Sequence, residues 1–155
     1  MSTEEGGKIV PDEWDRFETE VYKKITDGPT RELVKDFIGS QPRIKNIDPN
    51  QELKKAEELM KKREENERYM IDAMHGFRVA AYGAFWQELE DVEKFWNAYK
   101  NILGEVKTTA QWGYTNEVNA YEKLRQRKDI MKILIDTYNG KIGAPAKVKI
   151  EKSMD

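Results

Sequence analysis

Apolar residues recur at steps of three and four along most of the chain, which is the spacing of one buried face of a helix. A first run of such residues follows Pro11, which suits the first turn of a helix. Its members are Trp14, Phe17, Val21 and Ile25. A second short run lies between Thr30 and Ile38 and is ended by Gly39 and Pro42. The chain is therefore expected to begin with two short amphipathic helices.

An extended connector, SQPRIKNIDP at residues 40–49, separates these two helices from a longer one. Asp48 can cap the longer helix, because Pro49 then stands in its first turn and Gln51 takes the reciprocal capping position. The pattern predicts a single helix here that can run past residue 70.

The clearest helical spacing follows in the C-terminal half. One run alternates steps of three and four and consists of Leu89, Val92, Trp96, Tyr99 and Leu103. Gly104 is expected to end it. A last long helix has as its apolar side Tyr114, Val118, Tyr121, Leu124, Met131, Leu134 and Tyr138. It is expected to end at Asn139 and Gly140, and no strand-like alternation longer than KVKIE, at residues 147–151, appears.

The charged run KKREENER at residues 61–68 marks a boundary between two parts of the chain. Its acidic and basic residues interleave around a helix, where pairs at i, i+4 contribute about 0.2–0.5 kcal/mol each, so it needs no buried face. The predicted fold class is all-α, with an N-terminal helical arm followed by an antiparallel helical bundle. The expected divisions are a mobile tail at 1–10, the helical arm with its proline-marked connector at 11–68, the bundle at 69–140 and a C-terminal tail at 141–155.

Small residues form one stripe on the helix that follows this boundary. They fall at steps of three, four and three: Ala73, Gly76, Ala80 and Gly83. A glycine inside a helix costs about 0.8–1 kcal/mol relative to alanine, so two on one face indicate a close neighbour. The neighbour can be another helix, which is the commoner case, or a nucleic-acid backbone. A third interpretation is that Gly76 breaks the helix.

Large apolar residues flank the stripe and give this helix more apolar surface than one neighbour needs. Both a buried position in the bundle and a subunit interface explain that excess. Tryptophan and tyrosine are also enriched at the energetic centres of interfaces. The candidate interface residues are Ala73, Gly76, Ala80, Gly83, Phe85, Trp86 and Trp96.

The chain offers few residues for catalysis or metal binding. It has no cysteine and one histidine, His75. Asp72 and His75 have the spacing of half a di-iron carboxylate site, but that site needs a second histidine. No serine stands in a nucleophile elbow, and no glycine-rich phosphate loop is present. We therefore expect no enzymatic activity, no metal site and no cofactor.

The overall charge gives no strong attraction to polyanions, because 27 Lys and Arg face 29 Asp and Glu. Any nucleic-acid contact must come from local clusters. Arg43 and Lys45 lie in a segment without acids, and Arg31 and Lys35 lie one turn apart beside Phe37. The Glu/Lys-rich, cysteine-free composition matches a trend among hyperthermophile proteins. No stretch approaches the roughly 20 apolar residues of a membrane span.

Three stretches resemble the major coat proteins of rod-shaped and filamentous viruses of hyperthermophilic archaea, the rudivirus and lipothrixvirus group. GPTRELVKDFIGSQP at 28–42 is similar to a short helix entered through Pro-Thr and left through Ser-x-Pro. GFRVAAYGA at 76–84 resembles the segment that opens that family's C-terminal bundle. DIMKILIDTYNG at 129–140 resembles its closing apolar helix. Together the three stretches cover under a third of the chain.

The resemblance implies a capsid protein that dimerises, with itself or with a related coat protein, and wraps linear double-stranded DNA in a helical virion. Such a nucleocapsid would be assembled in the host cytoplasm. By position, the residues that it implies at the DNA phosphates are Arg31, Lys35, Arg43, Lys45 and Arg78. Contacts to phosphates position a protein without reading sequence. An alternative function is a small helical adaptor or inhibitor that binds another protein through the aromatic and small-residue surface of 70–103.

Overall fold

The computed structural model describes residues 7–106 and 111–142, and these form seven helices and one two-stranded antiparallel sheet. The helices are α1 (Pro11–Lys24), α2 (Gly28–Ile38), α3 (Pro49–Lys61), α4 (Glu67–Trp86), α5 (Val92–Leu103), α6 (Gln111–Leu124) and α7 (Lys128–Lys141). The strands are β1 (Gly7–Lys8) and β2 (Ile44–Lys45). The prediction of an all-α bundle is confirmed.

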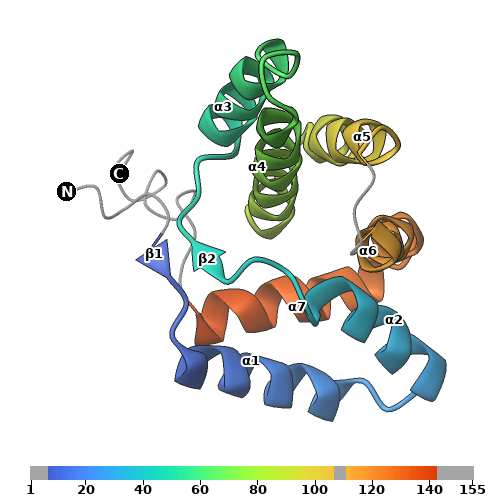
Figure 1. Cartoon of the computed structure of the whole chain (residues 1–155). Coiled ribbons are helices and arrows are strands. Elements are labelled where there is room, and N and C mark those ends of the chain that lie inside the picture. Colours follow the sequence, from blue (N-terminus) through green and yellow to red (C-terminus); the bar gives the residue numbers. More distant parts are fainter. Residues whose placement is uncertain (1–6, 107–110, 143–155) are drawn as a thin grey trace.

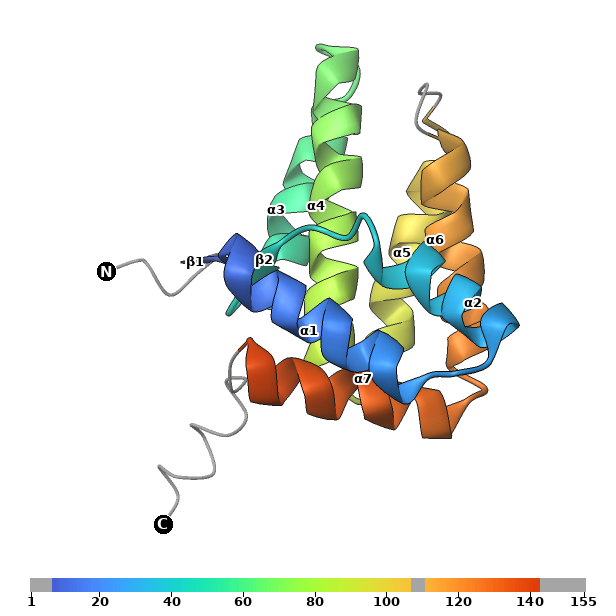
Figure 2. The same cartoon turned by 90° about the horizontal axis from the view of Figure 1, so that it is seen from below.

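Helix α4 lies in the middle of the bundle (Figure 1). α3 folds back along it, and α5 packs beside it from the C-terminal side of the chain. α1 and α7 lie side by side across the end of α4, and α2 packs along α6 (Figure 2). Each helix of the N-terminal half thus has its main partner in a helix farther along the chain.

The segment 11–68 is helical as expected, but it does not form an arm apart from the bundle. The apolar faces of α1 and α2 are too large to stay in solvent, and α7 and α6 cover them. The ring of Phe17 contacts the rings of Trp86 at 5.7 Å and Tyr138 at 5.8 Å between centroids. One core therefore joins the expected arm and the expected bundle.

The expected tails are described only in part. Residues 7–10 of the tail at 1–10 pack on the body, because Ile9 is buried and its N–H donates to the carbonyl of Arg43 at 2.9 Å. Of the C-terminal tail, Lys141 ends α7 and Ile142 is buried. Residues 1–6 and 143–155 lie outside the described residues, and so does the KVKIE segment.

The prediction of one helix running from Asp48 past residue 70 is wrong. α3 ends at Lys61, and Asn66 caps α4, its side-chain oxygen accepting from the N–H of Arg68 at 2.8 Å. The charged run has no apolar face to bury, so it can turn in solvent and let the two helices pack as a hairpin. The predicted cap at Asp48 is confirmed, because its carboxylate accepts from the Gln51 N–H at 3.2 Å.

The predicted last long helix is also two helices. Residues 125–127 are all polar and form the corner between α6 and α7, which point in different directions in Figure 1. α6 packs on α2 and α5, whereas α7 packs on α1, so one straight helix could not serve both sets of neighbours. α7 continues through Gly140 to Lys141, beyond the predicted end. The predicted end of α5 at Gly104 is confirmed.

Stacked aromatic rings hold the centre of the core together. Trp96 lies flat on Tyr121, with ring centroids 4.5 Å apart, and Trp86 lies flat on Tyr138 at 4.2 Å. These two pairs join α5 to α6 and α4 to α7. Burying rings of this size removes much apolar surface from water, and ring contacts add about 0.5–1.5 kcal/mol each.

The small-residue stripe of α4 faces other parts of the same chain. A Cβ on Gly76 would lie 3.1 Å from the Cβ of Ala56 in α3, and one on Gly83 would lie 3.1 Å from Cγ2 of Ile47. The prediction of a close neighbour is thus met by α3 and the connector before it. α4 continues through Gly76, so that glycine does not break the helix.

The candidate interface residues therefore belong to the interior of this chain. Six of them are buried, and Gly76 is half-buried against Ala56. The buried ones are Ala73, Ala80, Gly83, Phe85, Trp86 and Trp96. Their assignment to a subunit interface is corrected, because the sequence pattern of a close helix contact is the same whether the neighbour is in the same chain or another.

Replacing Gly83 by leucine should lower the free energy of unfolding by about 1–3 kcal/mol or more, because the new side chain would overlap Ile47 and Pro49. Gly140→Leu is the matched control, since nothing lies within 4 Å of a Cβ there. It should be neutral or stabilise by up to about 0.8 kcal/mol through helix propensity. Denaturant unfolding of both variants tests this. Equal effects at the two positions would show that Gly83 is not closely packed.

Candidate nucleic-acid interface

The five cations predicted to meet DNA separate into two groups. Three are exposed, two on α2 and one in the segment between α2 and β2: Arg31, Lys35 and Arg43. The other two, Lys45 and Arg78, are partly buried and pair with carboxylates of the same chain. Only the first group is available to a phosphate backbone.

The exposed group forms a row, which we name the α2 ridge and define as Arg31, Lys35 and Arg43. Arg31 and Lys35 are one turn apart on α2. A turn further along, the guanidinium of Arg43 lies 3.4 Å from the carbonyl of Gly39, to which it donates. Side chains four residues apart face the same way on a helix, so Arg31 and Lys35 lie on one side of α2, and Arg43 extends the group beyond the end of that helix.

Two residues of the ridge, Arg31 and Arg43, are held in place by contacts other than ion pairs. Arg31 donates through Nη2 to the carbonyl of Tyr22 at 2.8 Å. The guanidinium of Arg43 lies over the ring of Trp14, 4.7 Å from its centroid. None of the three ridge residues forms an ion pair with a carboxylate of residues 7–106 or 111–142. The ridge therefore exposes three cations that have no ion-pair partner among the described residues.

A surface hollow of about 340 Å³ lies beside the ridge between α1 and α2. Tyr22, Arg31, Glu32 and Lys35 line it. Burial, together with the charges of Glu18 and Glu32, raises the pKa of Tyr22 to about 12, so its hydroxyl keeps its proton at neutral pH. The hollow therefore offers two cations and a hydroxyl, with one carboxylate at its edge.

Lys45 is withdrawn from this surface by an ion pair. Its ammonium lies 3.2 and 3.0 Å from the two carboxylate oxygens of Glu13 on α1. The pair ties β2 to the start of α1, and it neutralises the charge that the sequence pattern had left unopposed. Its predicted role at phosphates is therefore not supported by its position.

Arg78 is held inside the bundle by Glu117, whose side chain is almost fully buried. Arg78 Nε donates to Glu117 Oε1 at 2.8 Å, and its Nη2 donates to Glu117 Oε2 and to the carbonyl of Ser40. The Tyr99 hydroxyl donates to Glu117 Oε1 at 2.9 Å, and the Ser40 hydroxyl donates to Oε2 at 3.2 Å. The buried carboxylate thus joins α4, α5, α6 and the end of α2.

This cluster was missed from the sequence, although one signal was present. Glu117 is the only charged residue in the stretch QWGYTNEVNAY at 111–121, which is the mark of a carboxylate turned inward. Burial, and then the charge of Glu117, raise the pKa of Tyr99 well above its usual value. The neutral tyrosine donates a hydrogen bond, and the arginine balances the carboxylate, so the cluster is structural.

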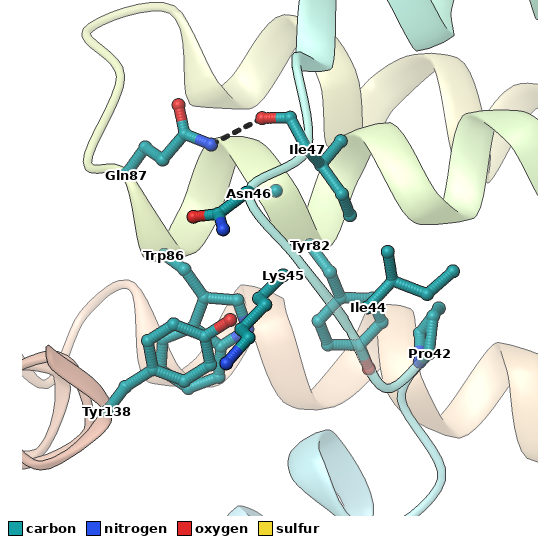
Figure 3. A pocket seen from close by; sticks show the side chains of 10 residues that line it. Pro42, Ile44, Lys45, Asn46, Ile47, Tyr82, Trp86, Gln87 and Tyr138 are labelled. Atoms are coloured by element: carbon teal, nitrogen blue, oxygen red, sulfur yellow. Dashed lines mark hydrogen bonds between the residues drawn. The ribbon is translucent and has the colours of Figure 1, made fainter. Parts of the chain in front are cut away.

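Figure 3 shows the small cavity beside β2, with Ile47 and Gln87 in the upper part of the view and Lys45 next to Trp86 and Tyr138 in the lower part. Gln87 donates to the carbonyl of Ile47 at 2.6 Å and closes one edge. The volume of about 20 Å³ is enough for a single water molecule and too small for a substrate.

The remaining candidates for chemistry are dispersed. Asp72 and His75 are both exposed on α4, and the His75 ring lies 6.1 Å from the ring of Tyr114. No group of three possible metal ligands occurs among the residues that the structure describes. In the same residues no helix has the length and apolar character to span a membrane.

The chain matches no protein-family model, and comparisons with curated proteins and with solved structures likewise return no match.

Glu117→Gln should lower the free energy of unfolding by about 3–5 kcal/mol, because Arg78 would lose the carboxylate that balances its buried charge. Glu122→Gln on the same helix is the control. Glu122 pairs with Lys100 in solvent, so its loss should cost no more than about 1 kcal/mol. Thermal and urea unfolding measure both. A small effect at Glu117 would mean that the cluster is not a centre of stability.

Proposed function

We propose that this protein is a structural nucleocapsid subunit that binds linear double-stranded DNA through its phosphates, without sequence specificity, in a helical virion. The observation that carries the proposal is the α2 ridge of Arg31, Lys35 and Arg43, three exposed cations in a row without carboxylate partners in the described residues. The stretch 28–42, which resembles the coat-protein family, contains the helix on which the ridge begins.

The ridge suits phosphates rather than bases. α2 is packed on α6, and Arg31 and Lys35 are exposed on it as long cationic side chains that can reach phosphate oxygens. Arginine and lysine contacts of this type release counterions and are insensitive to sequence. The contribution of each contact depends on salt.

Three phosphate contacts per subunit are too few for tight binding by one molecule. The logarithm of the binding constant should fall with the logarithm of salt concentration with a slope of about −2.7 per subunit, which is −0.9 for each contact. The net charge of −2 adds no general attraction. Stable binding therefore needs many subunits on one DNA, which is the arrangement in a coat filament. The subunits of such a filament would be homodimers or pairs with a related coat protein.

The alternative of an adaptor or inhibitor finds less support in the structure. That hypothesis needs the aromatic and small-residue surface of 70–103 to be accessible. Its principal residues are covered by α3, α5, α6 and the connector before α3. No specific observation favours it over the nucleocapsid proposal.

The experiment is a salt titration of binding to a labelled linear duplex, for the wild type and for a variant with Arg31→Gln, Lys35→Gln and Arg43→Gln. The wild type should bind two unrelated sequences with equal affinity and a slope of about −2.7 per subunit. The variant should lose most of the slope, because the phosphate contacts are gone while the rest of the protein is unchanged.

The matched control removes three lysines from other faces: Lys54→Gln, Lys94→Gln and Lys132→Gln. It changes the net charge by the same amount, so it should keep the wild-type slope apart from a small general weakening. Equal losses in both triple variants would show that net charge alone governs binding. Absence of duplex binding by the wild type at low salt would refute the proposed function.

A further inference from the structure

One helix of the bundle presents an uncharged face to solvent. On the first three turns of α6 the exposed and half-exposed residues of one side are Trp112, Thr115, Asn116 and Asn119, which we name the α6 face. Glu117 points the other way, into the ion pair with Arg78. The next charged residues of the helix are Glu122, which pairs with Lys100, and Lys123.

The α6 face contrasts with the rest of the described surface. Charged residues make up 36% of the chain, and each of the other six described helices exposes several of them. Interface centres are depleted in charge and enriched in tryptophan. The composition of the α6 face is therefore that of a contact surface rather than of a solvated helix.

Trp112 is the most informative residue of this face. It is 79% exposed, whereas Trp14, Trp86 and Trp96 are at most 4% exposed. Covering an exposed indole of this size by a partner lowers the free energy, because its apolar surface leaves water. It stands at the end of a stripe that runs through Asn116 and Asn119 to Lys123, at steps of four, three and four.

We propose that the α6 face binds the same face of a second copy of this chain, with the two α6 helices antiparallel about a twofold axis. If the two α6 helices cross midway between Asn116 and Asn119, the amide of Asn116 in one copy meets the amide of Asn119 in the other. It also brings Lys123 of each copy over Trp112 of the other. The contact is isologous, since each residue pair occurs twice.

Charge and hydrogen-bonding complementarity favour a second copy as the occupant. A charged partner surface would lose hydration against the α6 face and find no counter-charge there. The α6 face of a second copy has no charge at its centre. Its asparagine amides can both donate hydrogen bonds to the first copy and accept them from it. Lys123 has no ion pair with a carboxylate of the described residues, and an ammonium over an indole is a favourable contact.

The contact is small. The stripe from Trp112 to Lys123 is roughly 16 Å long at 1.5 Å per residue, which is short of a standard interface. Self-association should therefore be weak and should strengthen when subunits share one DNA, where the local concentration is high. The inference names the subunit contact of the proposed nucleocapsid and thus rests on that function, although the contact itself needs no DNA.

The first experiment follows Trp112 in the full chain without DNA. Because the other three tryptophans are buried, acrylamide quenching of the fluorescence reports mainly on Trp112. Quenching should decrease as the protein concentration rises from about 10 µM to about 1 mM, together with a shift from monomer to dimer in sedimentation. A monomer with unchanged quenching across this range would overturn the proposal.

Point variants test the face itself. Trp112→Ser should raise the dimer dissociation constant at least about tenfold, and Asn116→Lys should do the same by placing like charges at the axis. The control Asn97→Lys puts a lysine on the exposed side of α5 and should leave self-association unchanged. The melting temperature of each variant shows whether it is folded. An unchanged dimer dissociation constant in the Trp112 and Asn116 variants would show that the α6 face is not the dimer contact.

The absence of cysteine allows a second, independent readout. Single cysteines introduced by Thr115→Cys, Asn116→Cys and Asn119→Cys lie near the proposed axis, so at least one should form a disulfide-linked dimer under mild oxidation. Asn97→Cys should form none above background. If all four behave alike, the contact lies elsewhere.

These outcomes separate the inference from the proposed function. The α2 ridge variant should dimerise like the wild type, because its substitutions lie on another face. Trp112→Ser should retain the salt slope per bound subunit while losing self-association. Failure of DNA binding with intact dimerisation would refute the function and keep the contact, and the reverse result would refute the contact alone.

Discussion

The packing of the whole bundle follows from the close approach of α3 and its preceding connector to α4. Gly76 and Gly83 have no side chains, so Ala56 and Ile47 can lie against the backbone of α4. This contact covers one side of α4 with the chain that precedes it. The other sides then carry the large rings, which pack on α5, α6 and α7. Residues 80–86 of α4 are all buried, so this half of the helix joins the N-terminal and C-terminal parts of the fold in one core.

The burial of these residues limits which side chains can contact a partner. The residues with the strongest apolar signal, Trp86 and Trp96 among them, are used for the core and are not available to a partner. Two candidate binding surfaces remain exposed. The α2 ridge offers unpaired positive charge, and the α6 face offers an uncharged stripe with one exposed indole. The proposed DNA contact and the proposed self-association thus involve different helices, α2 and α6.

The sequence pattern predicted the helices better than their arrangement. Spacing identified the buried faces of α1, α2 and α5, because burial is what creates that spacing. It missed the turns at 62–66 and 125–127, because a run of charged residues is compatible with both a solvated helix and a solvated turn. Lys45 and Arg78 looked free because their partners, Glu13 and Glu117, are distant in sequence. Periodicity carries no information about such pairings.

The proposed contact with duplex DNA lies on α2 and the segment that follows it, at Arg31, Lys35 and Arg43. The most direct measurement is electron cryomicroscopy of the protein assembled with linear double-stranded DNA. We expect a regular filament in which α2 faces the phosphate backbone and Trp112 is covered by a neighbouring subunit. A filament with α2 on its outer surface, or no ordered particle on the DNA, would contradict it.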